Sequence, residues 1–300
     1  MRLTRVLASF LVAFVFAGPL APSARAQTTD QVGIRALGMG GAFTAVADDA
    51  AATWWNPAGL ASGAYFNAIL EYAHPDEGPG DGLRGVAFAF PALGLSYYRV
   101  PRPGSSSTST DTTPGSREDE GSLSVYGATV GQSIGNHLVV GSTVKLLRAD
   151  GTKTGLDVGA MAAFRHVRAG LMVRNATEPD FGSGAAAFTL QRHVRAGAAF
   201  VAVPRTLGQV TLSVDADLTT TDTAAGDERR VAVGAEVWTP RRGFAVRGGT
   251  SRSTTGPERS VFSGGASVAL RAGLFVDAQA TGGGTDKARR GWGLALRVTF

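Results

Sequence analysis

The sequence predicts an all-β protein: a transmembrane outer-membrane β-barrel of about 14 antiparallel strands, with an N-terminal hatch that plugs its lumen. Three observations predict this fold: an export signal at the amino end, a repeated unit of alternating segment and turn, and connections that alternate between long and short. We expect three parts, a signal peptide at 1–26, the hatch at 27–64 and the barrel at 65–300. The predicted location is the bacterial outer membrane.

The first 26 residues have the features of a secretory signal. Two arginines precede an apolar run from Val6 to Leu20, and Ala24-Arg25-Ala26 matches the A-x-A site of signal peptidase. A single anchoring helix is the alternative, but the run is short and contains Gly18-Pro19. We therefore expect cleavage, and a mature chain that starts near Gln27.

The composition excludes several classes of protein. The chain has 29 Lys and Arg against 24 Asp and Glu, and the signal holds three of the arginines, so the mature chain is nearly balanced at 26 against 24. Because the remaining basic residues are scattered, no nucleic-acid surface is expected. A secreted chain without cysteine must rely on a large core or a continuous sheet. No stretch after the signal offers about twenty uninterrupted apolar residues, so helical membrane spans are not expected.

Strand-like alternation fills the chain from Tyr65 onward. In Gln209 to Leu218, Val, Leu and Ala alternate with Gln, Thr, Ser and Asp, which places apolar side chains on one face and polar side chains on the other. About fourteen segments are predicted as strands. They are 65–72, 83–90, 93–100, 122–134, 137–148, 155–164, 167–175, 191–203, 209–218, 229–238, 244–250, 259–270, 273–280 and 292–300.

The connections between these segments distinguish the two ends of the barrel. Tight turns such as Gly135-Asn136 alternate with longer connections such as Ala149 to Thr154 and Pro101 to Gly121. Outer-membrane barrels have short periplasmic turns and longer external loops, and an even number of strands leaves both termini in the periplasm. A water-soluble sandwich also alternates apolar and polar residues, but it has no reason to keep this two-sided rule.

The alternation also predicts which charged side chains face the lumen, because each would cost a few kcal/mol if it faced lipid at mid-depth. The lumen-facing set is Lys145, Asp157, Arg168, Asp215, Glu236, Asp277 and Arg297. These charges form either a network that holds the plug or a line of sites along a transport path. Three aromatic side chains suit the interfacial girdles of a barrel: Trp238, Trp292 and Phe300.

The segment from Gln27 to Ala64 is apolar and rich in small residues, yet it fits neither a membrane helix nor a membrane strand. Its candidate functional residues are Gly38, Gly40 and Gly41, which break regular helix, Asp48 and Asp49, which lipid would not tolerate, and the turn Asn56-Pro57-Ala58. A barrel of about fourteen strands leaves a hollow interior, and this segment is the candidate occupant. Trp54 and Trp55 either line a ligand pocket or pack within the hatch. Five lumen-facing glycines are expected to leave room for the segment: Gly141, Gly159, Gly170, Gly234 and Gly293.

Three runs within this segment carry a family resemblance. They are Arg35 to Phe43 (RALGMGGAF), Ala47 to Ala50 (ADDA) and Trp55 to Leu60 (WNPAGL). Together they resemble the N-terminal hatch of the FadL superfamily of outer-membrane proteins, and they are most similar to its PorV/PorQ-like branch. The resemblance implies a barrel of fourteen strands closed by an N-terminal hatch.

The resemblance implies two functions, and a third possibility stands beside them. FadL-type proteins transport hydrophobic small molecules passively, whereas PorV-type proteins serve protein secretion or surface attachment; the barrel could also be mainly structural. The expected partners are outer-membrane lipid and either hydrophobic small molecules or secretion-system proteins. One feature departs from the FadL pattern: the loop from Pro101 to Gly121 is nearly all Ser, Thr, Pro, Gly and charged residues, which does not suit collection of an apolar substrate.

No enzyme, cofactor or metal site is expected. Gly131 to Gly135 matches the G-x-S-x-G pattern of esterases, but that chemistry needs a strand, a sharp turn and a helix, and here an alternating segment follows. The four histidines lack the spacing of metal ligands and fall at strand ends or in loops.

Overall fold

A computed structural model describes residues 31–76, 82–102, 122–182, 187–223 and 226–300. The predicted signal peptide, the first residues of the predicted hatch and most of the loop from Pro101 to Gly121 lie outside the described residues.

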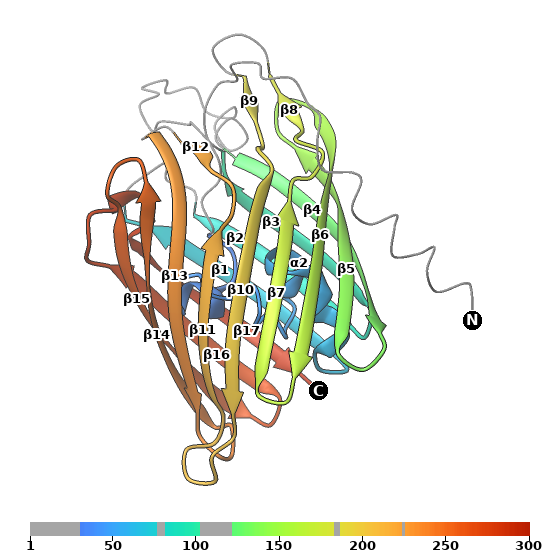
Figure 1. Cartoon of the computed structure of the whole chain (residues 1–300), viewed down its shortest axis with the longest axis vertical. Coiled ribbons are helices and arrows are strands. Elements are labelled where there is room, and N and C mark those ends of the chain that lie inside the picture. The colour runs from blue at the N-terminus through green and yellow to red at the C-terminus, as the bar shows by residue number, and fades with distance from the viewer. Residues whose placement is uncertain (1–30, 77–81, 103–121, 183–186, 224–225) are drawn as a thin grey trace.

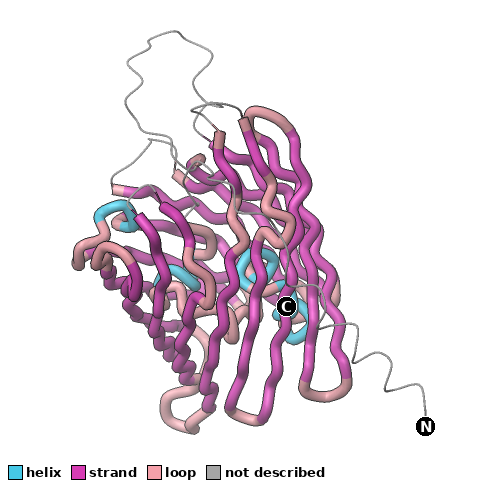
Figure 2. Tube along the Cα trace, turned by 45° about the horizontal axis from the view of Figure 1, so that its top comes forward, coloured by secondary structure: helices cyan, strands magenta, loops and turns pink. Residues whose placement is uncertain are grey.

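Fourteen antiparallel strands form a closed ring (Figures 1 and 2). They are β1 (Asn67–Pro75), β2 (Leu83–Phe90), β3 (Leu93–Pro101), β4 (Ser122–Ile134), β5 (Leu138–Arg148), β6 (Thr152–Phe164), β7 (Val167–Arg174), β10 (His193–Ala202), β11 (Val210–Asp217), β13 (Gly226–Trp238), β14 (Phe244–Thr255), β15 (Ser260–Arg271), β16 (Leu274–Gly282) and β17 (Gly291–Thr299). The first and last strands pair along their whole length, from Asn67 with Thr299 to Pro75 with Gly291, and this pairing closes the barrel. The predicted barrel of about fourteen strands is confirmed, and the bounds of β2 and β4 are the predicted ones.

Three short strands lie at the end of the barrel that carries the longer connections. β8 (Asp180–Phe181) pairs with β9 (Phe188–Thr189), and β12 (Thr221–Thr223) pairs with the start of β13. The sequence analysis assigned all three to loops, because two or three residues are too few to show a period. The connection from β5 to β6 is also shorter than predicted, since β6 begins at Thr152.

The two faces of the wall differ as the alternation predicts. Large apolar side chains are exposed on the outside, where lipid would lie; among them, Leu70, Val130, Val144 and Leu270 are 56–61% exposed. Polar and charged side chains point inward and are buried, so a register slip of one residue would turn them to lipid. Among the described helices, none is long and apolar enough to cross a bilayer.

Trp238 differs from its predicted place at a membrane interface. It shares a face with Glu236, two residues earlier, and therefore points into the barrel, where it is 3% exposed. Its ring packs edge-on against Phe275, with centroids 5.5 Å apart. Trp292 and Phe300 are exposed, as a girdle position requires.

The described residues of the predicted hatch, 31–64, lie inside the ring of strands (Figure 1) and are here called the luminal segment. The segment forms three short helices, α1 (Ile34–Gly38), α2 (Ala52–Trp55) and η2 (Pro57–Ser62). Gly40 and Gly41 follow the end of α1 and turn the chain, with φ angles of 70° and 81° that residues other than glycine rarely adopt. Asn56 begins η2: its side chain accepts a hydrogen bond from the Ala58 N–H, and Pro57 occupies the first turn.

Candidate functional site: the luminal segment, its seat and the external pocket

Glycines of the barrel wall form the seat of the luminal segment. A Cβ atom built at Gly141 would lie 2.5 Å from the carbonyl carbon of Pro57 and 2.6 Å from the amide nitrogen of Ala58. At the four other glycines named from the sequence, an added Cβ would likewise overlap the segment; these are Gly159 against Asn56, Gly170 against Thr44, Gly234 against Met39 and Gly293 against Ile34. At Gly141, Gly170 and Gly234 backbone therefore packs against backbone, whereas Gly159 and Gly293 make room for the side chains of Asn56 and Ile34.

Arg35 forms the central ion pair between the segment and the wall. Its Nε and Nη2 atoms donate to the two carboxylate oxygens of Glu236 at 2.8 and 2.7 Å, a bidentate pair. The same guanidinium donates through Nη1 to Asp48 at 2.5 Å and to Asp49 at 3.1 Å. Glu236 is completely buried, so this pair is shielded from water and salt.

The pKa values of the two adjacent aspartates, Asp48 and Asp49, shift in opposite directions. Burial favours the neutral form of Asp48, but the Arg35 guanidinium beside it outweighs that effect and lowers its pKa below the ordinary value. At Asp49 burial dominates and raises the pKa, although the same guanidinium opposes the rise. Asp48 also faces Arg168 of the wall at 3.6 Å.

Wall side chains also hold the backbone of the segment. The Glu71 carboxylate accepts hydrogen bonds from the N–H groups of Gly33 and Ile34 at 3.0–3.1 Å. Asp215 Oδ2 accepts from the N–H groups of Phe43 and Thr44 at 3.0 and 2.8 Å. The segment is irregular, so these backbone N–H groups have no partner within a helix or sheet. The carboxylates of Glu71 and Asp215 accept their hydrogen bonds, and the N–H groups are therefore not buried without a partner.

Asn56 joins the segment to the opposite wall. Its amide nitrogen donates to the carbonyl oxygen of Thr44 at 2.8 Å and to that of Ala160 in β6 at 3.2 Å. Asn56 therefore links two turns of the segment to each other and to the barrel, while Pro57 and Ala58 lie against Gly141.

Two further pairs of the predicted lumen charges lie within the wall itself. Lys145 Nζ contacts Asp157 Oδ1 at 2.7 Å. Arg297 Nε donates to Asp277 Oδ2 at 2.8 Å, and Arg247 and Ser267 extend this group. The structure thus places all seven predicted lumen charges inward, in contact with one another or with the segment. This arrangement is what a network that holds the segment requires.

Trp54 and Trp55 pack inside the segment and against the wall. Trp55 is 1% exposed and donates through Nε1 to the carbonyl of Val32 at 2.9 Å. The guanidinium of Arg174 lies 5.0 Å from the Trp54 ring, and Trp54 packs edge-on against Tyr98. Neither indole lines the external pocket described next.

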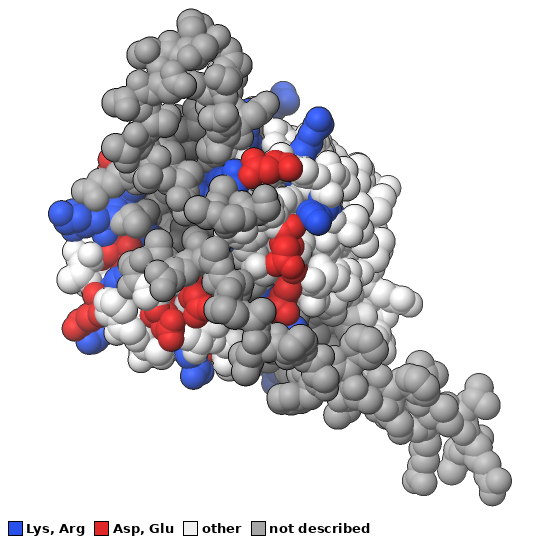
Figure 3. Space-filling model, turned by 90° about the horizontal axis from the view of Figure 1, so that it is seen from above, with Lys and Arg blue, Asp and Glu red and all other residues white. Residues whose placement is uncertain are grey.

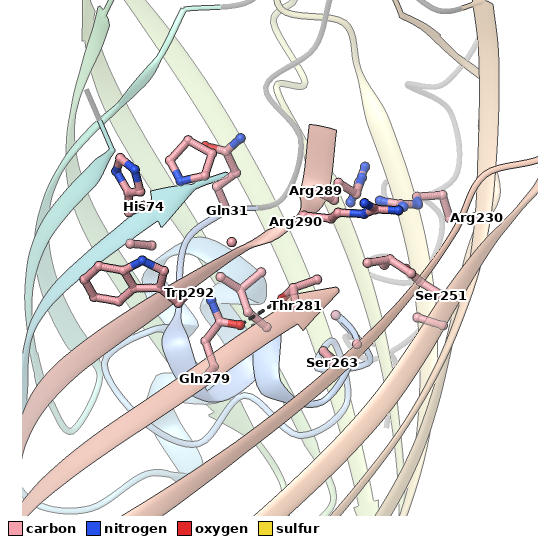
Figure 4. A pocket seen from close by; sticks show the side chains of 18 of the residues that line it. Gln31, His74, Arg230, Ser251, Ser263, Gln279, Thr281, Arg289, Arg290 and Trp292 are labelled. Atoms are coloured by element: carbon pink, nitrogen blue, oxygen red, sulfur yellow. Dashed lines mark hydrogen bonds between the residues drawn. The ribbon is translucent and has the colours of Figure 1, made fainter. Parts of the chain in front are cut away.

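A pocket opens above the luminal segment at the external end of the barrel (Figure 4). Its floor is formed by Leu37, Gly40 and Gly41, and it holds about 740 Å³ of space, part of it open to solvent. Its wall is mixed: apolar Ala73, Pro75, Ala232 and Val261 alternate with polar Ser251, Ser263, Gln279 and Thr281. Arg230, Arg289 and Arg290 lie together at one side of it, and charged side chains of both signs surround this end of the barrel (Figures 3 and 4).

The other side of the external end is covered. Phe181 of β8 and Phe188 of β9 stack with ring centroids 5.0 Å apart, and both are buried. They join the same apolar cluster as Leu123 and Leu147 of the wall. The pocket lies on the side formed by β10, β13–β17 and β1, where α1 contacts β14–β17.

Replacement of Asp215 by Ala is expected to loosen the segment without opening the barrel. The change leaves the N–H groups of Phe43 and Thr44 buried and unpaired, which costs about 1–3 kcal/mol for each group. Asp215→Asn keeps one acceptor oxygen and serves as the matched control. Amide hydrogen exchange at Phe43 and Thr44 should be faster in the alanine variant than in the asparagine variant, and equal rates in both would show that Asp215 does not hold these amides.

Sequence reasoning missed several residues of the seat. Arg35 was noted only within the family motif, and Glu71, Asn67 and Arg247 were not singled out. Glu71 lies on the polar face of β1, so the alternation carries the signal that could have found it. The contact between Arg35 and Glu236 spans 201 residues, and no local pattern indicates it.

Among the described residues, no group of three or more His, Asp or Glu side chains could hold a metal ion. Gly131 to Ile134 lie within β4 and lead through a tight turn into β5, not into a helix. The geometry is that of a closed barrel with an occupant and an adjoining pocket.

Comparisons with known proteins agree with this fold. The barrel is similar to the toluene transporter TbuX of Ralstonia pickettii, with a TM-score of 0.63 and 12% identity over 90% of this chain and 98% of the transporter. A triple mutant of the Rhodopseudomonas blastica porin gives a TM-score of 0.40 and 11% identity over 78% of this chain and 99% of the porin. OmpT of Vibrio cholerae, with its loop L8 deleted, gives 0.38 and 13% over 78% and 98%.

Comparisons of the sequence match only a part of this chain. The family model described as "F plasmid transfer operon, TraF, protein" matches residues 146–217, which is less than half of the chain. No curated protein matches. The closed ring of fourteen strands, its apolar exterior and the likeness to TbuX together show that this chain is a bacterial outer-membrane β-barrel with a fold similar to that of TbuX.

Proposed function

We propose that this barrel passively transports hydrophobic small molecules across the outer membrane, and that the luminal segment is the hatch that closes the route. The observation that carries the proposal is the external pocket, whose floor is the luminal segment itself at Leu37, Gly40 and Gly41. An apolar molecule bound there touches the element that must move for it to pass. The likeness in fold to a protein described as a toluene transporter supports the same class of cargo.

The proposed route passes the segment where its backbone changes direction. Gly40 and Gly41 stand at positive φ beneath the pocket, and Asn56-Pro57 marks the second turn. Rotation at these two points would shift α1 away from β14–β16 and η2 away from β4–β6 together. The polar sequence from Pro101 to Gly121 gives no reason to place collection of the cargo in that loop, so entry is assigned to the pocket.

Uptake into vesicles tests the proposal. Proteoliposomes whose outer leaflet contains lipopolysaccharide should take up a fluorescent apolar probe such as N-phenyl-1-naphthylamine faster than empty vesicles of the same composition. Equal uptake rates would contradict transport. A stable complex with exported proteins in the absence of uptake would instead favour the PorV-like interaction role.

A disulfide between the segment and the wall should abolish uptake. The chain has no native cysteine, and a Cβ atom at Gly131 in β4 would lie 3.7 Å from the Cβ of Ala61 in η2, close to the separation of about 3.8 Å in disulfides. The A61C/G131C variant should lose uptake when oxidised and regain it when reduced. The two single variants are the controls. Unchanged uptake by the fully oxidised protein would show that the segment does not move at η2.

A further inference from the structure

The end of the barrel that carries the tight turns has a one-sided charge. Its six connections are 91–92, 135–137, 165–166, 203–209, 239–243 and 272–273, and together with the adjoining Arg271 they hold five arginines and no Asp or Glu. The arginines are Arg165, Arg205, Arg241, Arg242 and Arg271, and all five are exposed. The connections at the opposite end (76–82, 102–121, 149–151, 175–192, 218–225, 256–259 and 283–290) carry thirteen carboxylates against seven Lys and Arg in their sequence.

The five arginines form one continuous arc rather than a scattered set. They come from the turns β6–β7, β10–β11, β13–β14 and β15–β16. Because β7 pairs with β10, β11 with β13 and β14 with β15, these four turns follow one another around the ring. We call this group the arginine arc.

Apolar side chains beside the arc place it at the surface of the membrane. Phe164 immediately precedes Arg165 and is 55% exposed, and Phe244, two residues after Arg242, is 43% exposed. Val203 and Leu207 flank Arg205 and are 71% and 56% exposed. Outward apolar side chains at strand ends mark the edge of the hydrocarbon, so the guanidinium groups next to them lie at the level of the lipid headgroups.

The protein itself does little to neutralise the arc. Within the described chain, no ion pair joins Arg165, Arg205, Arg241 or Arg271 to a carboxylate. Arg242 donates to the neutral side-chain oxygen of Gln209 at 2.7 Å, and its guanidinium lies 5.5 Å from the Trp238 ring at the rim of the lumen, where it also interacts electrostatically with Asp48. Arg165 and Arg242 also occupy turn positions with φ angles of 48° and 52°. Glycine and asparagine suit such positions better than arginine, so turn formation does not explain the choice of arginine there.

We propose that the arginine arc binds the phosphate groups of anionic phospholipids in the periplasmic leaflet. The C-terminal residue Phe300 pairs through its backbone with Phe66 at this end. Because the tight turns also lie here, this is the periplasmic end of an outer-membrane barrel. The planar guanidinium group matches phosphate oxygens in a bidentate geometry. A lipid annulus follows the wall from turn to turn, as the arc does.

Lipid binding by the purified protein tests the proposal. Native mass spectrometry in detergent should show binding of phosphatidylglycerol in preference to phosphatidylcholine, and each arginine should contribute about fivefold to the affinity for the anionic lipid. The variant R165N/R205Q/R241Q/R242N/R271Q should lose this preference by at least about tenfold. Asparagine at positions 165 and 242 suits the turn geometry, and heat-dependent mobility on a gel verifies that the barrel has assembled.

A matched variant at the opposite end is the control. Arg84, Arg148 and Arg252 are exposed near the external ends of their strands, and R84Q/R148Q/R252Q should keep the lipid preference. Higher salt should weaken phosphatidylglycerol binding by the wild type and not by the arc variant. Equal affinity of the wild type for the two lipids, or an unchanged preference in the arc variant, would overturn the proposal, and so would binding of an acidic protein without binding of the anionic lipid.

Discussion

Valine in place of Gly141 is expected to expel the luminal segment and open the barrel. Even a Cβ atom at this position would lie 2.5 Å from the Pro57 carbonyl carbon, and the partner is backbone that cannot rotate away. Overpacking of a tightly packed site costs about 1–3 kcal/mol, and here the wall is a hydrogen-bonded ladder, whereas the hydrogen bonds between wall and segment all involve a side chain. The segment should therefore yield, and the conductance of single barrels in planar bilayers should rise about tenfold or more, because a ring of this size leaves a hollow interior.

The matched control for this variant is Gly264→Val. Gly264 faces outward in β15, and a Cβ atom there would meet only the carbonyl oxygen of Arg247 at 3.9 Å. This variant changes strand propensity in the same way but leaves the seat intact, so its conductance should match that of the wild type. A closed G141V barrel, or an equal increase in both variants, would show that the seat does not hold the segment shut.

Removal of the Arg35 side chain should give the second large effect. Arg35→Ala leaves Glu236 as a completely buried carboxylate without its bidentate partner, and the loss of one member of a buried pair costs about 3–5 kcal/mol. Because the pair joins the segment to the wall, this cost should appear as local opening of the segment before the barrel unfolds. Protection of the amides of residues 34–44 against hydrogen exchange measures it.

The double variant R35M/E236M separates the ion pair from packing. An apolar pair of similar volume removes both charges of this pair, but Asp48, Asp49 and Arg247 each lose one partner, so the double variant should recover only part of the protection that R35A loses. Lys145 and Asp157 lie elsewhere in the wall and provide an independent pair for comparison. If R35A leaves exchange in residues 34–44 unchanged, or if the double variant is as open as R35A, the ion pair does not hold the segment.

The fold could be predicted from the sequence because its determinants are local. Period-two alternation and two classes of connection gave every one of the fourteen long strands, and most bounds differ by one to three residues. Larger differences occur where strands extend beyond the membrane, as in β14, which continues to Thr255 through a polar sequence that shows no apolar period. Trp238 was misplaced because its aromatic character was given more weight than its position in the alternation.

The seat of the luminal segment was less accessible to sequence reasoning. Gly141, Gly159, Gly170, Gly234 and Gly293 stood out because glycine weakens a strand and needs a reason to be there. Their individual partners, and the pairing of Arg35 with Glu236, depend on how an irregular segment crosses a closed ring, which no period encodes. The external pocket depends in the same way on residues from seven strands and two short helices.

The central claim is that the luminal segment occupies the barrel, and thiol accessibility tests it most directly. Thr53 in α2 is 3% exposed and close to cysteine in size, whereas Tyr65, before β1, is 78% exposed. With membrane-impermeant maleimide, T53C in the folded barrel should react slower than Y65C by about a hundredfold or more, since local opening must precede labelling. Both variants should react equally in denaturant, and T53C should react quickly when G141V is added. Rapid labelling of T53C in the folded wild-type background would contradict the account.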